Sequence, residues 1–299
     1  MKIVVTGASG FLGRYILNEL EGEVHTLGRS RSNSIQCNLD SEVPILPEVD
    51  MVIHNAGWAH RVPKTPEQER RFYEVNLFGT QNLLKGFDSN GTFPKAFVYI
   101  STVAVYGLSS GNLISEKNEV KPETPYARSK FEAELLLQKW AKKHQVNLTI
   151  LRLPLIAGAI QTPGNLGAMI KAIQKGYYFR IGTGQARKSI VLAQDVARLL
   201  PRLNNSSGIF NLTDGVNPSI AQLEDYLGEF FGRKIRTIFP WFLKLAARVG
   251  DVIPVFPINS YRLEKLGESL TFDDSKARAE LAWNPRPVIG NLDLEKRIK

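Results

Sequence analysis

The sequence predicts an α/β fold built on a doubly wound parallel sheet, with a smaller α/β lobe toward the C-terminal end. In the first half of the chain, short apolar runs alternate with helical patterns. A glycine-rich turn, residues 6–13, joins the first apolar run to the first helical pattern. Because parallel strands need crossover connections, this order of strand, helix and strand indicates a parallel sheet with right-handed crossovers.

Each expected strand is a nearly continuous apolar run, the pattern of a strand buried on both faces. The expected strands are residues 3–6, 24–27, 51–54, 97–101, 148–153 and 209–212. The expected helices are residues 11–20, 67–85, 126–144, 167–174 and 195–203. From residue 215 onward the pattern is helical and irregular.

The composition excludes several classes of protein. With 43% hydrophobic and 22% charged residues, the 299-residue chain resembles an ordinary globular protein, not a disordered chain or a coiled coil. A single cysteine, Cys37, leaves no partner for a disulfide, and the four histidines are too dispersed for a metal site. We therefore expect a cytoplasmic protein without a metal.

The net charge of +9 comes from 38 basic and 29 acidic residues scattered along the chain. Dispersed basic residues indicate a solvated surface, so no nucleic-acid partner is expected. The N-terminus runs directly into an apolar strand and lacks the pattern of a signal peptide. The apolar stretch 238–258 is interrupted by charges and prolines, so no integral membrane segment is expected, and attachment to a membrane surface stays open.

The turn at residues 6–13, TGASGFLG, is the first candidate site. Gly7 permits a tight turn, Gly10 lets the backbone approach a pyrophosphate, and Gly13 lets the helix pack closely on the sheet. The phosphates of a dinucleotide would lie at the helix N-terminus, where free N–H groups favour anions. The cofactor-binding residues expected here are Gly7, Ser9, Gly10, Phe11, Leu12 and Gly13.

The second strand ends in Gly28-Arg29-Ser30, where an NAD site usually has an acidic residue. A guanidinium cannot accept hydrogen bonds from ribose hydroxyls, but it suits a 2′-phosphate. Arg29 therefore favours NADP, with NAD as the alternative.

Tyr126 and Lys130 stand four residues apart at the start of a predicted helix and so share one face. A nearby ammonium, together with a charged nicotinamide ring, is expected to lower the pKa of the tyrosine from about 10 toward neutrality. Upstream, residues 99–107 read YISTVAVYG, which places the hydroxyls of Ser101 and Thr102 at the carboxyl end of a strand, where ligands bind in such sheets.

These motifs together resemble the NAD-dependent epimerase/dehydratase family of extended short-chain dehydrogenases/reductases, which act mainly on nucleotide sugars. Further similar stretches are DMVIHNAG at residues 50–57, VNLFGTQNLL at 75–84 and the closing segment at 272–285. The resemblance extends over nearly the whole chain.

The resemblance implies a role for each matching residue. Tyr126 is implied as the general acid/base, Lys130 as the residue that binds the nicotinamide ribose, and Thr102 as the group that binds the substrate hydroxyl. Implied cofactor contacts are Asn38, where the family more often has Asp, together with Leu39, Ala56, Gly57, Asn76 and Ser101. Implied diphosphate-binding residues of the substrate site are Asn165, Leu166 and Arg187.

Within the family, dehydratases carry an Asp-Glu pair after the catalytic Thr, and this chain has Val103-Ala104 instead. The remaining alternatives are a 4-keto reductase and a UDP-sugar 4-epimerase. Leu155, at a position where UDP-galactose 4-epimerases have Asn, and Arg29 both favour a UDP-4-keto-6-deoxy-hexosamine 4-reductase. A non-catalytic dinucleotide sensor or scaffold is a remoter alternative.

The change of pattern after residue 153 predicts two lobes, with the chain crossing between them more than once. A Rossmann domain is expected to comprise residues 1–157 and about 191–214. A nucleotide-sugar-binding lobe is expected to comprise residues 158–190 and 215–299. The resemblance also implies a homodimer that pairs through the helices near 67–85 and 126–144.

Overall fold

The computed structural model describes residues 1–59, 61–159, 161–238 and 267–294. Its centre is a seven-stranded parallel sheet with the strand order β11-β7-β5-β4-β1-β2-β3. The strands are β1 (Lys2–Thr6), β2 (Glu23–Gly28), β3 (Ile35–Gln36), β4 (Met51–His54), β5 (Ala96–Thr102), β7 (Asn147–Leu153) and β11 (Gly208–Asn211). The predicted doubly wound fold is confirmed, since the chain winds outward in both directions from β1.

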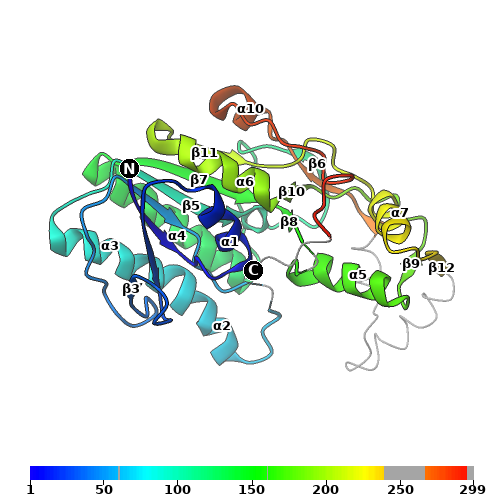
Figure 1. The fold of residues 1–299 in the computed structure, drawn as a ribbon, viewed down its shortest axis with the longest axis horizontal. Helices are drawn as coiled ribbons and strands as arrows, with labels where there is room; N and C mark the ends of the chain where they lie inside the picture. Colours follow the sequence, from blue (N-terminus) through cyan, green and yellow to red (C-terminus); the bar gives the residue numbers. More distant parts are fainter. Residues whose placement is uncertain (60, 160, 239–266, 295–299) are drawn as a thin grey trace.

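Helices cover both faces of this sheet (Figure 1). One face packs on α1 (Phe11–Glu19), α6 (Ala193–Leu199) and α10 (Ser275–Leu281). The other face packs on α3 (Gly79–Asn90) and α4 (Pro125–His144). Neighbouring residues of β1 enter opposite cores: Ile3 and Val5 lie in the first and Val4 in the second, as the two-residue period of a strand requires.

A second lobe lies beside the carboxyl ends of the strands (Figure 1). It contains α5 (Gly164–Lys175), α7 (Ile220–Phe230) and short parallel strand pairs. These pairs are β8 (Leu155–Ala157) with β10 (Ile190–Leu192), β9 (Phe179–Ile181) with β12 (Arg236–Ile238), and β6 (Gly111–Ile114) with β13 (Leu270–Phe272). The strand β10 joins the two lobes, because Val191 enters the core of the main sheet while Ile190 and Leu192 enter that of the second lobe.

The helix predicted over residues 67–85 is divided in the structure. It comprises α2 (Pro66–Tyr73), a π-helical turn (Glu74–Phe78) and α3. The extra residue of a π turn rotates the helix, which places Asn76 in the interior. The sequence period alone does not reveal this insertion. The predicted helix 195–203 likewise consists of α6 and a 3₁₀ segment, Leu200–Asn205.

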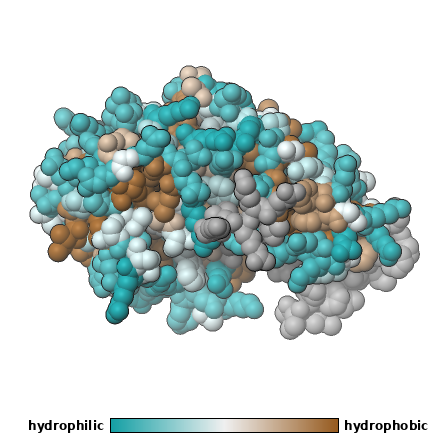
Figure 2. Space-filling view, in the orientation of Figure 1, coloured by the Kyte–Doolittle hydropathy of each residue, from teal (hydrophilic) through white to brown (hydrophobic). Residues whose placement is uncertain are grey.

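Hydrophilic side chains cover most of the face shown in Figure 2, and apolar residues form separate patches between them. The apolar stretch 238–258 lies almost wholly outside the described residues. Within the described ranges, no helix is both long and apolar enough to cross a membrane.

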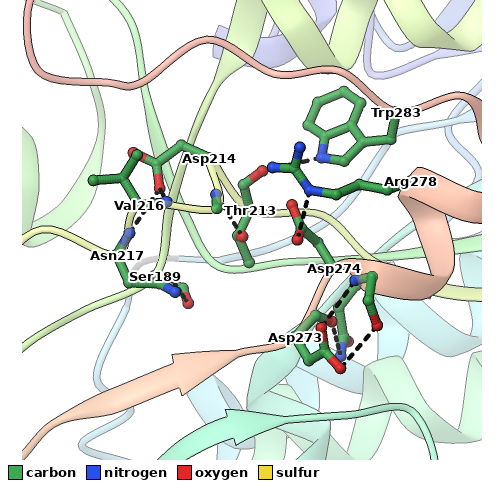
Figure 3. A network of polar contacts seen from close by, with 12 residues as sticks. Ser189, Thr213, Asp214, Val216, Asn217, Asp273, Asp274, Arg278 and Trp283 are labelled. Carbon is green, nitrogen blue, oxygen red and sulfur yellow. Dashed lines mark hydrogen bonds and ion pairs between the residues drawn. The ribbon is translucent and has the colours of Figure 1, made fainter.

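A buried aspartate holds the chain where it leaves the main sheet for the second lobe (Figure 3). Asp214 Oδ1 accepts hydrogen bonds from the backbone N–H groups of Val216 and Asn217, both at 3.0 Å. Its Oδ2 accepts one from the N–H of Val288 at 3.1 Å. The carboxylate therefore joins the loop after β11 to the C-terminal segment.

One further contact closes the same joint (Figure 3). The indole of Trp283 donates to the carbonyl oxygen of Thr213 at 3.0 Å. Gly215, with a φ of +72°, lets the chain turn at this point in a left-handed conformation that favours glycine.

We expect Asp214→Ala to lower the free energy of unfolding by about 3 kcal/mol, because three buried N–H groups would lose their acceptor. Denaturant unfolding monitored by tryptophan fluorescence measures the loss. Asp225→Ala is the control, since it removes an exposed ion pair with Arg180 and should cost less than about 1 kcal/mol. Equal losses in both variants would contradict the role of Asp214 in the joint.

Candidate active site

The candidate site begins where the strand order of the sheet reverses, between β1 and β4. The loops that follow these two strands leave the carboxyl edge side by side, and such an edge is where open α/β sheets bind ligands. The side-chain amide of Asn55 donates to the carbonyl oxygen of Gly7 at 3.0 Å. The backbone N–H of Ala56 donates to Thr6 Oγ1, also at 3.0 Å. These two bonds join the loops into one unit.

Gly7 is required by this arrangement on two grounds. Its φ of +69° is a left-handed conformation, and a Cβ at this position would lie 2.7 Å from the backbone nitrogen of Ala56. Gly13 is required by close packing instead, since a Cβ there would lie 2.2 Å from the carbonyl oxygen of Gly7. The roles expected for these two glycines therefore match their geometry.

The N-terminus of α1 carries no side-chain cap, and Gly10 is its N-cap residue. The first N–H groups of the helix thus have no side-chain partner, the arrangement that receives a phosphate. Ser9 and Gly10 are exposed beside them, whereas Leu12 is buried in the core of the sheet. Phe11 packs edge-on against Tyr15 with ring centroids 5.4 Å apart.

A polar pocket lies beside the end of β2 and is lined by Arg29, Gln36, Cys37, Asn38 and Glu42. Within the described part of the chain, Asn38 Oδ1 is buried and has no hydrogen-bond partner. An unpaired amide oxygen of this kind can accept a hydrogen bond from the exocyclic amine of adenine. The neighbouring Leu39 places its side chain in the core, so a contact from this residue to a ligand would come from its backbone.

Glu42 is a pocket residue that the sequence did not single out. Its carboxylate accepts the backbone N–H of Asn38 at 2.8 Å, which fixes the turn that carries the unpaired amide. The exposed Arg29 belongs to the same pocket, so a ribose there would meet one cation and one carboxylate.

His54 organises the floor of the site from β4. Thr80 Oγ1 donates to the Asn76 carbonyl at 2.7 Å, so it accepts from His54 Nε2 at 2.8 Å. His54 Nδ1 then accepts from the hydroxyl of Thr6 at 2.6 Å. Burial, reinforced by the charge of Lys130, lowers the pKa of His54 to about 3. The imidazole is therefore neutral and does not serve as an acid or base at ordinary pH.

Thr102 and Tyr126 come together at the carboxyl end of β5, as the sequence predicts. The side chain of Thr102 begins the 3₁₀ segment Val103–Tyr106 and accepts the N–H of Ala104 at 3.2 Å. Tyr126 lies in the first turn of α4, and its ring centroid is 5.9 Å from that of Phe72. The hydroxyl of Thr102 lies close enough to the Tyr126 phenol to lower its pKa.

Lys130 lies one turn further along α4 and is 4% exposed. Its Nζ donates to the carbonyl oxygen of Ile100 at 2.6 Å and stands 4.0 Å above the ring centroid of Tyr99. A Cβ added to the exposed Gly57 would lie 4.0 Å from the same Nζ and 3.3 Å from Asn76 Oδ1. The backbone of Gly57 thus borders the lysine.

The lowered pKa expected for Tyr126 includes the charge of a bound nicotinamide, and in the protein alone the pKa shifts in the opposite direction. Burial raises the pKa of its phenol above 10, and the nearby hydroxyl of Thr102 offsets part of that rise. Lys130 does not reverse the effect, because burial lowers the pKa of its own ammonium to about 7, against a smaller opposite effect of Glu134. Tyr126 is therefore protonated at neutral pH.

Ser101 and Asn76, both implied as cofactor contacts, use their polar hydrogens within the protein. Ser101 Oγ donates to the carboxylate of Glu134. Asn76 Nδ2 donates to Ser129 Oγ at 2.9 Å and to the carbonyl oxygen of Trp58 at 3.2 Å. These contacts give Asn76 a structural role, since they join the loop after β4 to α4.

The residues implied for the diphosphate lie in the second lobe. Asn165 is exposed and is the second residue of α5, which begins at Gly164, three residues before the expected start at residue 167. Leu166 is buried in the core of the lobe, so its side chain cannot contact a ligand. Arg187 is exposed, and its Nη1 donates to the carbonyl oxygen of Asn217 at 3.2 Å.

The described ranges contain no group of three His, Cys, Asp or Glu side chains that could hold a metal ion. The polar groups gathered at this edge are instead hydroxyls, amides and one lysine. They can bind a dinucleotide and transfer a proton.

We expect Gly7→Ala to abolish dinucleotide binding and to destabilise the fold, because the new methyl group would push the loops after β1 and β4 apart. Gly91→Ala is a matched control: its φ of +68° is nearly identical, yet nothing lies within 4 Å of the added Cβ. It should cost about 1 kcal/mol and leave binding intact. Thermal unfolding and quenching of tryptophan fluorescence by NADPH measure the two effects. Equal behaviour of both variants would contradict the steric role of Gly7.

Comparison with known proteins identifies the family. The model of the NAD dependent epimerase/dehydratase family matches residues 3–212. Among curated proteins, the chain is 26% identical to the N-acetyl-alpha-D-glucosaminyl-diphospho-ditrans,octacis-undecaprenol 4-epimerase of Escherichia coli O157:H7, over 98% of this chain and 93% of that protein. It is also 26% identical to the UDP-glucose 4-epimerase of Vibrio cholerae, over 95% of this chain and 90% of that protein.

Solved structures agree on the fold. The UDP-glucose 4-epimerase of Thermotoga maritima superposes with a TM-score of 0.74 at 21% identity, covering 95% of this chain and 94% of that one. The protein RMD of Pseudomonas aeruginosa, solved with NADPH, superposes with a TM-score of 0.71 at 21% identity, covering 97% and 96%. Since the family model matches most of the chain, the protein is an enzyme of the NAD dependent epimerase/dehydratase family.

Proposed function

We propose that the enzyme is an NADPH-dependent reductase that acts at C4 of a UDP-4-keto-6-deoxy-hexosamine. One observation carries the proposal. Thr102, Tyr126 and Lys130 lie at the carboxyl edge of the sheet, where the glycine-rich turn of residues 6–13 also lies. The two residues that follow Thr102, Val103 and Ala104, cannot transfer protons. Such a site can move a hydride and one proton, but it lacks the acid and base that removal of water needs.

The residues at the carboxyl edge fit a nicotinamide dinucleotide. The uncapped start of α1 suits its diphosphate, and the unpaired Asn38 Oδ1 suits its adenine. Lys130, which borders Gly57, would bind the ribose next to the nicotinamide. When bound, the reduced nicotinamide supplies the hydride that reduces C4 of the sugar.

Tyr126 supplies the proton in this proposal. As the C4 carbonyl gains a hydride, the phenol gives its proton to the forming alkoxide, which becomes the hydroxyl of the product. The phenolate then regains a proton from solvent. The raised pKa of Tyr126 supports this direction, because a protonated phenol is the form required at the start of a reduction. The hydroxyl of Thr102 stabilises the same oxygen.

The second lobe would hold the nucleotide sugar. We assign residues 158–190 and 215–299 to that lobe, except for α10, which packs on the main sheet. We assign residues 1–157 with about 191–214 to the Rossmann domain, except for β6 and β8, which pair with strands of the second lobe. Arg187 is a suitable diphosphate ligand, since a guanidinium can bind phosphate oxygens through two parallel hydrogen bonds. Asn165 lies at the start of α5, where helix N–H groups also favour an anion.

A UDP-sugar 4-epimerase is the second candidate. Relatives that match nearly the full length of the chain include the 4-epimerases of Escherichia coli and Vibrio cholerae. A GDP-6-deoxy-D-mannose reductase of Pseudomonas aeruginosa is 35% identical, but over 46% of this chain and 47% of that protein. Leu155 and Arg29 favour the reductase.

A non-catalytic dinucleotide sensor remains the remoter alternative, since a sensor would not need Thr102, Tyr126 and Lys130.

We also propose a cytoplasmic homodimer that pairs through α3 and α4. Two large apolar side chains are exposed on these helices and the π turn: Phe78 is 43% and Leu135 is 42% exposed. Burial of such side chains against a second copy of the chain would remove apolar area from water.

A direct assay distinguishes the candidates. The enzyme is mixed with a UDP-4-keto-6-deoxy-hexosamine and NADPH or NADH, and absorbance of the reduced nicotinamide is followed. Decay with NADPH supports the reductase. Interconversion of UDP-hexose C4 epimers without net oxidation supports the epimerase, and silence in both assays, with intact NADPH binding, supports the sensor.

We expect Tyr126→Phe to lower kcat by about 10²- to 10⁴-fold, because the proton donor is lost, while the Kd for NADPH changes little. Steady-state kinetics and fluorescence titration measure these two quantities. Tyr226→Phe is the control, since Tyr226 packs on the core of the second lobe. Turnover of Tyr126→Phe at the wild-type rate would exclude the assigned role.

We expect Arg29→Ala to raise the KM for NADPH about ten- to hundredfold and to leave that for NADH unchanged, because one charge-assisted contact to the 2′-phosphate is lost. Arg31→Ala tests the specificity of the effect, since Arg31 is an exposed arginine nearby that does not line the pocket. A parallel loss with both cofactors in Arg29→Ala would show that Arg29 does not select NADP.

A further inference from the structure

A buried carboxylate lies two turns beyond Tyr126 on the same face of α4. Glu134 is 0% exposed. Its Oε2 accepts from Arg152 Nη2 at 2.7 Å, and its Oε1 accepts from Arg152 Nε at 3.2 Å and from the hydroxyl of Ser101. The carboxylate therefore ties α4 to β5 and β7, one residue before Thr102.

The partners of Glu134 belong to a row across three strands. Ser101 in β5 is the register partner of Arg152 in β7, which in turn pairs with Asn211 in β11. The Arg152 guanidinium stands 4.8 Å from the ring centroid of Tyr106, whose hydroxyl donates to Asn211 Oδ1 at 2.9 Å. Because the members of the row are bonded to one another, a shift of α4 relative to β5 would break several buried contacts together.

Glu134 is also the one carboxylate that acts on Lys130 among the described residues. Of the other groups around the lysine, His54 from β4 is neutral, and burial raises the pKa of Tyr99 from β5 well above 10. Tyr126, on α4, is neutral as well. Arg152 from β7 adds a positive charge behind the carboxylate, so that Glu134 stands between two buried cations.

We propose that Glu134 is a positioning residue of the active site: through its bonds to Ser101 and Arg152 it holds Tyr126 opposite Thr102, and its carboxylate, one turn from Lys130 on the same face of α4, is the counterion of that lysine. This inference rests on the proposed function for its catalytic consequence. It names a residue that makes no contact with the reacting atoms and acts through its neighbours.

The stability of the fold does not by itself explain why the Glu134 carboxylate and the Arg152 guanidinium are buried together. Replacing a buried ion pair by apolar residues of similar size is often neutral or stabilising, since both charges must be taken out of water. An effect on Lys130 gives a different expectation. Removal of the Glu134 charge would leave Lys130 and Arg152 as two buried cations without a counterion, which disfavours the charged lysine.

The test compares Glu134→Gln with the wild-type protein and with Glu132→Gln, a change on the exposed face of the same helix. The titration of Lys130 is followed in the protein without cofactor by NMR of lysine labelled with ¹³C at Cε, and is assigned with Lys130→Met. We expect the wild type and Glu132→Gln to titrate near pH 7. Glu134→Gln should titrate at least about 1 pH unit lower. An unchanged midpoint in Glu134→Gln would overturn the inference.

If Arg152, left unpaired, prevents Glu134→Gln from folding, the double variant Glu134→Gln/Arg152→Met takes its place. Its reference is Arg152→Met, because loss of the Arg152 charge by itself favours the charged lysine. The midpoint of Lys130 should lie lower in the double variant than in Arg152→Met, and equal midpoints would overturn the inference as well.

Kinetics supply the second readout. In Glu134→Gln the basic limb of the kcat profile should move to lower pH together with the lysine titration, while the KM for NADPH stays within about threefold. A uniform loss of activity at every pH, with an unchanged lysine titration, would indicate a structural role alone and would overturn the proposal. If the wild type reduces no keto-sugar, the proposed function fails, and the lysine titration still decides what Glu134 does to Lys130.

Discussion

The close approach of the loops after β1 and β4 is the constraint on which the rest of the site depends. A Cβ at position 7 would lie 2.7 Å from the backbone nitrogen of Ala56, so Gly7 is the residue that allows Ala56 to reach Thr6. This crossing sets the start of α1 beside the end of β4. The crossing therefore fixes the positions of the glycine-rich turn at residues 6–13, of His54 and of the backbone of Gly57.

The sheet and the pairing of Tyr126 with Lys130 could be predicted from the sequence for a simple physical reason. Long apolar runs such as β5 and β7 must be buried on both faces, and a period of four places Tyr126 and Lys130 together whatever surrounds them. Short strands such as β9 and β12 were not predicted, because three residues carry no usable period. The π-helical turn escaped prediction because one inserted residue leaves the composition of a helix unchanged.

Contacts between distant residues account for most of what the sequence did not reveal. In the sequence, Glu134 is one polar residue among several on a helix. Only the fold brings Arg152, which is 18 positions away along the chain, beside it. Leu166 is a second case: the sequence does not reveal that its side chain fills the core, which leaves its backbone for any contact with a ligand. The burial that raises the pKa of Tyr126 in the protein alone is likewise a property of the fold.

Packing between α1 and the residues that follow β8 has a mechanical consequence. The hydroxyl of Tyr15, on α1, accepts the backbone N–H of Ala159 at 2.9 Å, and a Cβ at Gly158 would lie 2.7 Å from the ring of Phe11. The start of α1, next to the glycine-rich turn, is thus in direct contact with the chain that leads from β8 toward α5. Because closely packed groups resist compression, a displacement of either segment moves the other.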